Sequence, residues 1–251
     1  MIGFGRTDLG SVRLNNEDSI FVSNEKVGPF DNLYIISDGM GGHNAGEVAS
    51  GKAIEFFVER VKTYDDDLAD DGILDVMTEA VRHANSNVYS ISLQDRSLTG
   101  MGTTFTAVTF TRGRCYIAHL GDSRAYVLNS AGIKQITVDH TYVNDLVRAS
   151  IISDEQARTH HLRNVITRAL GSEADCKVDA YSVDIEKGDK FLLCSDGLTT
   201  MLEDGLIESV TVNGTDLEGI ISQLINLANE RGGFDNISVI LIGEGVLEHG
   251  A

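Results

Sequence analysis

Three aspartates each follow an apolar stretch that is typical of a buried strand. YIISD ends at Asp38, IAHLGD at Asp122 and LLCSD at Asp196, and Asp235 opens a fourth apolar run, NISVILIG. The end of a strand fixes a carboxylate better than a free loop does, and a set of rigid carboxylates suits a hard divalent cation. The pattern therefore predicts a Mg²⁺ or Mn²⁺ site built from carboxylates.

Two of these aspartates share one local context, the tripeptide SDG at residues 37–39 and 195–197. A single Asp-Gly pair most often marks a hairpin turn. Here the first SDG is followed by a helical pattern, in which Asn44 and Glu47 are spaced as an N-cap and its N3 partner, and the second by a helical or irregular segment. The repeated order of strand, Asp, Gly and helix favours one shared site over two unrelated turns.

Cations held by carboxylates alone keep water ligands, which they acidify and orient for attack on an ester. Such a site predicts hydrolysis of a phosphate ester, and it needs a cationic side chain for the substrate phosphate. Arg13 lies five positions before Asp18 in GSVRLNNEDS, a segment that otherwise carries acids. Guanidinium binds phosphate well, although Arg13 taken alone is an ordinary surface arginine.

Other reaction classes lack their signatures. The cysteines, Cys115, Cys176 and Cys194, form no C-x-x-C pair and lie in no C-x₅-R segment, and there is no GxxxxGK[ST] loop. Zinc binding, cysteine-based phosphatase chemistry and nucleotide hydrolysis on a P-loop are therefore disfavoured. Cys115 and Cys194 lie in apolar runs and are expected to be small buried core residues.

The elements that must position these residues are mostly strands. Short β-branched and aromatic runs bounded by Gly, Asp or Asn predict strands at 18–23, 32–38, 102–110, 114–121, 123–129, 133–138, 177–184, 190–196 and 236–243. Helical spacing predicts helices at 45–63, 73–94, 141–159 and 216–231. Strands follow one another between residues 103 and 137 with no helix between them, which favours antiparallel sheets flanked by helices. The predicted class is α+β, a layered sandwich.

The charge composition disfavours two classes of binding partner. The chain has 251 residues, with 20 Lys and Arg against 38 Asp and Glu, and its net charge of −18 repels nucleic acid and anionic membranes. No apolar run approaches the roughly 18 residues of a membrane span, and the start of the chain does not resemble a signal peptide. With no linker-like tract, residues 1–251 are expected to form a single domain. We expect a cytoplasmic monomer.

Eight segments together resemble the metal-dependent protein phosphatases of the PPM family (type 2C), in their compact bacterial form. In family order they are TDLGSVRLNNEDS, SDGMGGHNAGEVAS, LTGMGTTFTAV, AHLGDSRAYVL, DHTYVNDLVRASIIS, RNVITRALG, LCSDGLTTML and ERGGFDNISVIL. They span about residues 3–243. The resemblance implies two antiparallel sheets packed face to face with helices on both outer faces, an α-β-β-α sandwich, and a flap at about residues 140–171.

The resemblance also implies a metal site at one edge of the sandwich, holding two Mn²⁺ or Mg²⁺ ions and, as in bacterial relatives, a third. The implied metal ligands are Asp38, which bridges two ions, the Gly39 carbonyl, Asp196, Asp235 and, for the third ion, Asp122 with Asp196. Asp18 would hold a metal-bound water and Arg13 the substrate phosphate. Asn236 would orient the turn at Asp235.

The sequence departs from the family pattern at two places. Many relatives have a His directly after the Asp-Gly pair as the candidate general acid, whereas Met40 stands here; His43 and a water on the third metal are the two replacements. In the flap, His160 and His161 stand where a His-Pro pair is common, and Ser150 stands where a Gly is usual.

The implied activity is hydrolysis of phosphoserine and phosphothreonine in proteins, by in-line attack of a hydroxide that bridges two metal ions. Phosphorylated proteins are the expected substrates, and a Ser/Thr kinase is the expected opposing partner. The alternative is a catalytically silent binding module that keeps the fold and signals by docking. That alternative needs a broken metal site, whereas Asp18, Asp38, Asp196 and Asp235 are all present.

Overall fold

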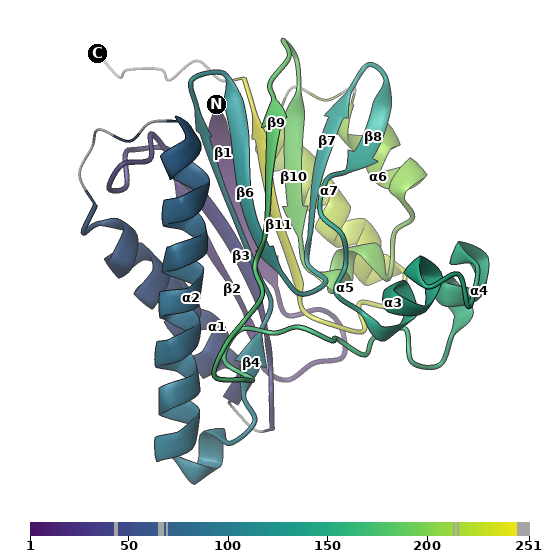
Figure 1. Ribbon diagram of the computed structural model, residues 1–251. Helices are drawn as coiled ribbons and strands as arrows, with labels where there is room; N and C mark the ends of the chain where they lie inside the picture. The colour runs from purple at the N-terminus through teal and green to yellow at the C-terminus, as the bar shows by residue number, and fades with distance from the viewer. Residues whose placement is uncertain (43–44, 65–67, 69, 213, 215, 245–251) are drawn as a thin grey trace.

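The computed structural model describes the whole chain except residues 43–44, 65–67, 69, 213, 215 and 245–251. Two antiparallel sheets pack face to face between two groups of helices (Figure 1). The first sheet has the order β1 (Ile2–Asp8), β11 (Ile237–Gly243), β10 (Lys190–Cys194), β7 (Arg124–Asn129), β8 (Gly132–Gln135). The second has the order β2 (Asp18–Ser23), β3 (Leu33–Met40), β5 (Phe105–Thr111), β6 (Arg114–Leu120), β9 (Asp179–Asp184), and β4 (Gly102–Thr103) pairs with the end of β3. The predicted α+β sandwich is confirmed.

Helices cover both outer faces. α1 (Ala45–Val61) and α2 (Asp70–Gln94) pack on the second sheet, and a short 3₁₀ helix, η1 (Arg96–Leu98), follows α2. α5 (Asp196–Thr199), α6 (Asp204–Thr211) and α7 (Leu217–Glu230) pack on the first sheet. Among the described residues no helix has the length and apolar character needed to cross a lipid bilayer.

The apolar side chains form three layers between the four layers of backbone. In β3, Leu33 and Ile35 face α1 and α2, while Tyr34 and Ile36 face the other sheet, because successive side chains of a strand point to opposite faces. Cys115 and Cys194 are fully buried, as predicted. Both central sheets are thus apolar on both faces, and polar residues gather at the strand ends.

Two parts of the fold differ from the sequence prediction. The predicted helix at 141–159 is two helices, α3 (Tyr142–Arg148) and α4 (Asp154–Thr159), because Ser150 takes a left-handed φ of 57° and Ser153 starts α4 with a capping box to Gln156. β1 was not predicted, because IGFGRTD is an edge strand with two glycines and mostly exposed side chains.

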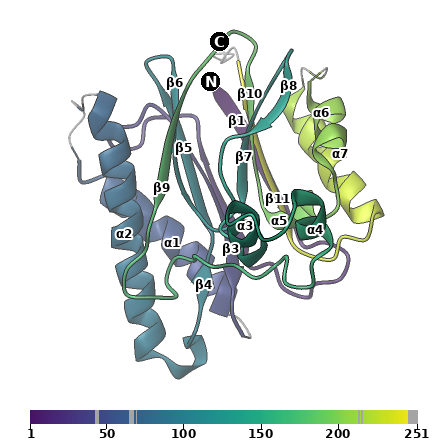
Figure 2. The same ribbon diagram turned by 45° about the vertical axis from the view of Figure 1, so that its right-hand side comes forward.

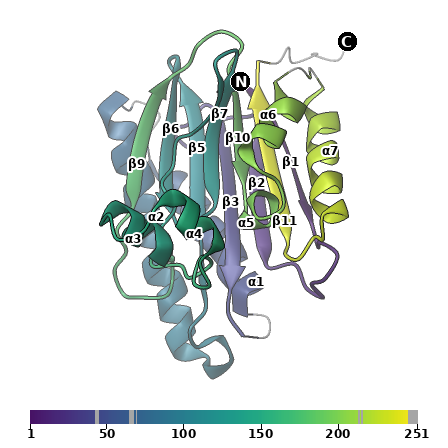
Figure 3. The same cartoon turned by 90° about the vertical axis from the view of Figure 1, so that its right-hand side faces the viewer.

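α3 and α4 stand apart from the four layers. In Figures 2 and 3 they lie in front of the lower part of the sandwich, the part in which β3 ends. Their base is a pair of neighbouring segments, since Thr141 bridges Ile166 and the Tyr142 amide donates to the Val165 carbonyl (2.8 Å). They belong to the segment that the sequence predicts as the flap.

Candidate active site

The first pair of candidate carboxylates lies on adjacent strands. Asp18 opens β2 and stands opposite Asp38 in the antiparallel register, so both side chains project from the same face of the second sheet. Asp38 is fixed through its backbone: its amide donates to Thr104 Oγ1 (2.9 Å), and its carbonyl accepts from Thr103 Oγ1 (2.8 Å). The TT pair of GMGTTFTAV therefore positions Asp38.

The second sheet meets the first at Asp18. Ser195 Oγ, at the end of β10, donates to Asp18 Oδ2 (2.9 Å) and accepts from the Ser238 amide of β11 (2.9 Å). Asp196 follows Ser195 directly and begins α5. The serine of the second SDG thus ties the carboxylates of the two sheets together across the sandwich.

Asp122 belongs to the same site. It lies in the short connection between β6 and β7 and is 7% exposed. The next residue, Ser123, shares a hydrogen bond with Thr104 (Oγ to Oγ1, 2.7 Å), and Thr104 also holds the Asp38 amide. One buried threonine therefore connects strand β3 at Asp38 with the loop that carries Asp122.

Both glycines of the SDG segments are required by close backbone packing. A Cβ on Gly39 would stand 2.0 Å from the Gly46 carbonyl oxygen, and a Cβ on Gly197 would stand 2.0 Å from the Asn236 carbonyl oxygen. Neither glycine has a positive φ, which both central residues of a type I′ hairpin turn need. The hairpin-turn interpretation of the two Asp-Gly pairs is therefore wrong: each Gly lets a second segment approach the aspartate before it.

Arg13 and Asp235 meet at the rim of the site. Arg13 Nη2 lies 2.7 Å from Asp235 Oδ2, and both side chains are partly exposed. Asn236, which is buried, holds the loop that carries Arg13: its side-chain amide donates to the Leu9 and Asn15 carbonyls (3.0 Å each), and its Oδ1 accepts from the Glu17 amide (2.9 Å). Asn236 thus positions a whole loop, a larger role than orienting its own turn.

Glu17 is a site residue that the sequence reasoning missed. Its Oε1 is buried without a hydrogen-bond partner, and burial raises the pKa of its carboxyl. Its side chain packs where a Cβ on Gly46 would lie, 2.7 Å away, beside the Gly39 backbone. A buried carboxylate oxygen without a donor is costly unless a proton or a cation satisfies it. The acidic pair at 17–18 in NNEDS was the available signal.

The buried carboxylates of the site repel one another, and this repulsion adds to the effect of burial on their pKa values. Burial, reinforced by neighbouring carboxylates, raises the pKa of Asp18 to about 7, of Asp122 to about 8 and of Asp196 to about 6. The pKa of Asp38 is raised well above its ordinary value by burial and by the charges of Asp18, Asp196 and Asp122. Such a cluster is stabilised by protons or by cations.

The donor set fits a hard divalent cation, because it consists of carboxylate and carbonyl oxygens with no sulfur or imidazole among the described candidates. Within the described part of the chain, however, no three His, Cys, Asp or Glu side chains already form a set that could hold an ion. Asp235 is engaged by Arg13 instead. The oxygen donors that a hard cation prefers are therefore present, and Asp235 is paired with Arg13 at the rim of the cluster.

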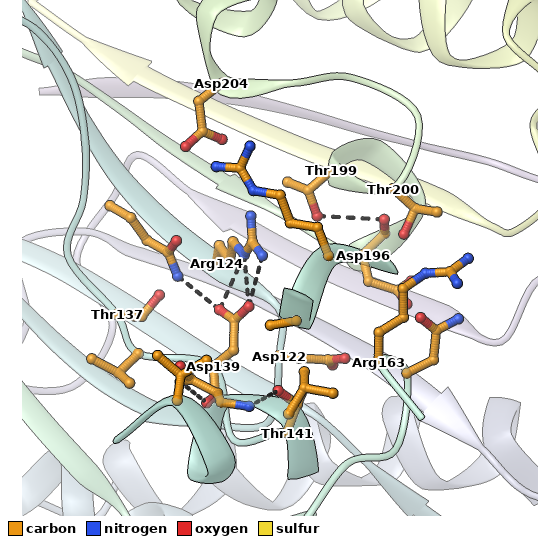
Figure 4. A pocket seen from close by; sticks show the side chains of 18 of the residues that line it. Asp122, Arg124, Thr137, Asp139, Thr141, Arg163, Asp196, Thr199, Thr200 and Asp204 are labelled. Atoms are coloured by element: carbon orange, nitrogen blue, oxygen red, sulfur yellow. Dashed lines mark hydrogen bonds and ion pairs between the residues drawn. The ribbon is translucent and has the colours of Figure 1, made fainter. Parts of the chain in front are cut away.

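A cavity of about 980 Å³ adjoins this cluster. Figure 4 shows Asp122 and Asp196 on one wall, with Arg163 of the flap segment beside them. Arg124, which also lines the cavity, forms a bidentate pair with Asp139 (2.7–3.0 Å). The cavity therefore shares the two predicted third-metal ligands with the cluster and opens toward the flap.

The structure shows no general acid at the positions that it describes among those considered from the sequence. Met40 ends β3 and pairs with Gly102, so this position offers no proton. His43 lies outside the described residues, as does Asn44, the predicted N-cap of α1. His160 and His161 stack on each other at the C-terminal end of α4 (4.6 Å between ring centroids), and neither lines the cavity.

Known proteins resemble this chain along nearly its whole length. The family model described as protein phosphatase 2C matches residues 11–238. A serine/threonine phosphatase, stp, from Listeria innocua is 35% identical over 247 residues, which cover 98% of this chain and 96% of the relative.

Solved phosphatase structures also superpose on this chain. The serine/threonine phosphatase Stp1 of Staphylococcus aureus superposes with a TM-score of 0.89 at 32% identity, covering 98% of this chain and 96% of that one. The catalytic domain of the serine/threonine protein phosphatase PstP, in complex with two manganese ions, superposes with a TM-score of 0.81 at 35% identity over 95% and 96% of the two chains.

Proposed function

Because the chain belongs to the protein phosphatase 2C family, we propose that it is a metal-dependent phosphatase that hydrolyses phosphoserine and phosphothreonine in proteins. The observation that carries this proposal is the convergence of Asp18, Asp38, Asp122 and Asp196 from both sheets, with raised pKa values, beside Arg13. The intact carboxylate set argues against the silent binding module. Phosphorylated proteins are the proposed substrates, and a Ser/Thr kinase is the proposed opposing partner.

The proposed residues for two Mn²⁺ or Mg²⁺ ions are Asp38, the Gly39 carbonyl, Asp196 and Asp235, with Asp122 and Asp196 for a third ion. Manganese is favoured by the PstP structure with two manganese ions. When bound, these ions lower the pKa of water and neutralise phosphoryl oxygens. Gly39 can offer its carbonyl because its missing Cβ leaves room for Gly46.

Arg13 is the proposed phosphate-binding residue. Its guanidinium is half-exposed at the rim, and its loop is clamped by three hydrogen bonds to the side chain of Asn236. A clamped arginine binds a phosphoryl group with a smaller entropy cost than a free one. Arg13 therefore exchanges its partner from Asp235 to substrate phosphate as the site fills.

Asp18 is the proposed acceptor for the attacking water. Ser195 Oγ donates to Asp18 Oδ2 and fixes the orientation of this carboxylate. A carboxylate oriented in this way can accept a hydrogen bond from water and hold it in place. His43 is the proposed source of the proton for the leaving alkoxide, since Met40 cannot supply one.

The test is the pair of substitutions Asp38→Asn and Asp235→Asn, assayed with para-nitrophenyl phosphate and a phosphothreonine peptide across a Mn²⁺ titration. Each should lower kcat/KM by about a thousandfold or more, because a ligand charge and water activation are lost together. Asp184→Asn is the matched control, since that side chain is 83% exposed on β9 and pairs with Arg114. Near-native turnover of either site variant at saturating Mn²⁺ would contradict the assignment.

A further inference from the structure

His140 is a buried histidine at the base of the flap, 2% exposed, and the proposed reaction does not use it. Its backbone joins three segments: its amide donates to the Gly121 carbonyl (2.8 Å), and its carbonyl accepts from the Thr167 amide (2.8 Å). Gly121 precedes Asp122, and Thr167 lies on the returning segment of the flap base, next to the bridge between Thr141 and Ile166. His140 therefore lies where the flap meets the loop of the predicted third-metal ligand.

The imidazole makes a second connection to the same loop. Nδ1 lies 3.1 Å from the Gly121 amide nitrogen, and Nε2 lies 3.1 Å from Asp179 Oδ2 on β9. A backbone N–H can only donate, so Nδ1 must be the unprotonated nitrogen, and Nε2 carries the proton that Asp179 accepts. Arg168 Nη1 lies 3.2 Å from Nε2 and 3.0 Å from Asp179 Oδ1, and in this tautomer it donates to the carboxylate.

Gly121 is held from its other side as well. Its φ is 111°, a conformation that favours glycine, and a Cβ there would stand 2.6 Å from the Thr104 side chain. The peptide is thus fixed between Thr104, which also holds the Asp38 amide, and the ring of His140. Figure 4 shows Asp139 and Thr141, the two neighbours of His140, on the cavity wall beside Asp122.

We propose that His140 is a positioning residue for Asp122. Its Nδ1 fixes the Gly121 peptide, and Asp179 fixes its tautomer, so that the orientation of the Asp122 carboxylate is set by the base of the flap. The proposal rests on the proposed function for Asp122 as a cation ligand and for the kinetic consequence; the hydrogen bond itself is measurable without cation or substrate.

Two conservative variants test the hydrogen bonds of the two ring nitrogens separately. His140→Asn places an amide oxygen where Nδ1 lies and keeps the acceptor for Gly121, while His140→Gln places its amide where Nε2 lies and keeps the link to Asp179. Each loses one hydrogen bond, so a merely structural role predicts equal effects. His161→Gln is the control for the same change at an exposed flap histidine outside the cavity lining.

The readouts are amide exchange at Gly121 by NMR, Mn²⁺ binding by calorimetry and kcat against KM for a phosphothreonine peptide. His140→Gln should speed Gly121 exchange and weaken the weakest Mn²⁺ site by about five-fold, the factor that one neutral hydrogen bond represents. His140→Asn should keep both within about two-fold of wild type. Equal effects of Asn and Gln, or an unchanged weakest Mn²⁺ site in His140→Gln, would overturn the proposal.

A measurement on the wild-type protein protects the test against variants that fail to fold. Nitrogen-15 spectra of the histidines report which ring nitrogen carries the proton. We expect His140 protonated on Nε2, with a scalar coupling from Nδ1 to the Gly121 amide nitrogen across the hydrogen bond. A proton on Nδ1 would overturn the proposal. If the wild-type protein shows this coupling and binds Mn²⁺ but does not hydrolyse the phosphothreonine peptide, the proposed function is contradicted instead.

Discussion

At the scale of single residues, the glycines of the two SDG segments show how a familiar pattern can be misinterpreted. An Asp-Gly pair is typical of a hairpin turn because glycine readily takes a positive φ. Here glycine is needed for another reason: a second backbone segment packs where its Cβ would be. Gly39 admits the Gly46 carbonyl and Gly197 admits the Asn236 carbonyl. The sequence predicted that these aspartates share one site, and the structure places them close together. The partner segments could not be predicted, because they lie 7 and 39 residues away from these glycines in the chain.

Gly197→Ala should therefore destabilise the protein by about 3 kcal/mol or more and displace Asp196, because a Cβ would overlap a backbone oxygen that cannot move aside cheaply. Gly205→Ala is the matched control. Gly205 also lies in a helix, and nothing stands within 4 Å of an added Cβ, so its substitution should be neutral or stabilise by about 0.5 to 1 kcal/mol. Urea unfolding of both variants decides; equal behaviour would refute the steric explanation.

The raised pKa of Asp122, about 8, predicts a pH dependence of the metal-free protein. An unfolded Asp titrates near pH 4, so above that value the folded state binds more protons than the unfolded state. Stability must then fall as pH rises through the folded pKa, by about 1 kcal/mol between pH 7 and 9 for this one group. Unfolding in chelator at pH 7, 8 and 9 measures the slope.

Asp122→Asn should flatten that slope and raise stability in chelator at pH 9, while reducing the stabilisation that Mn²⁺ gives to wild type. The buried histidines do not interfere, because the pKa values of His119 and His140 are lowered by burial and both are neutral throughout this range. Asp184→Asn should leave the slope as it is. An identical slope in wild type and Asp122→Asn would show that Asp122 does not titrate in this window.

At the scale of elements, strand positions were largely predictable, and helix boundaries in the flap were not. The uninterrupted apolar run LYII and the apolar spacing of α7 both reflect burial, which residue type encodes locally. The break between α3 and α4 depends on one backbone torsion at Ser150, a residue type that does not announce a left-handed φ. β1 was missed because its partner, β11, pairs Ile2 with Gly243 at the far end of the chain.

Ser150→Gly should stabilise the flap. α3 ends in a Schellman motif, in which the Ile151 amide donates to Leu146 O (2.9 Å) and the Ser150 amide to Val147 O (2.8 Å). Glycine adopts the required left-handed conformation without a Cβ penalty, for a gain of about 0.5 to 1 kcal/mol.

Ser209→Gly provides the same chemical change inside α6, where φ is helical, and should cost about 0.5 kcal/mol. Amide exchange across α3 and α6 measures the two effects locally. We expect slower amide exchange in α3 of Ser150→Gly and faster exchange in α6 of Ser209→Gly. Unchanged or faster exchange in α3 would contradict the role assigned to Ser150.

At the scale of the whole molecule, an apolar layer joins the two sheets. Phe110 and Phe191 meet edge to face at 4.9 Å between ring centroids, one from each sheet, within the apolar layer that separates them. This layer was predictable as buried, since the strands are apolar on both faces, but its pairing of strands was not, because the contacts join segments far apart in the chain.

Phe191→Ala should lower the free energy of unfolding by about 3 to 5 kcal/mol, because it removes a fully buried ring between two sheets. Phe234→Ala serves as the control, since that ring is 61% exposed and its removal should change stability by about 0.5 kcal/mol or less. Denaturant titrations in saturating Mn²⁺ compare them. A small effect of Phe191→Ala would mean that the sheets do not depend on this contact.

The strand order of the first sheet has a consequence for synthesis on the ribosome. β11, the last strand described, lies between β1 and β10, and Asp235 and Asn236 stand just before it. A nascent chain therefore holds β1 without a partner, and the Arg13 loop without its clamp, until residues 235–243 have been synthesised. The second sheet, whose strands all lie between residues 18 and 184, can assemble earlier. A nascent polypeptide that has not yet reached residue 235 would thus hold an assembled second sheet and no activity, and it would become active only after β11 has inserted between β1 and β10.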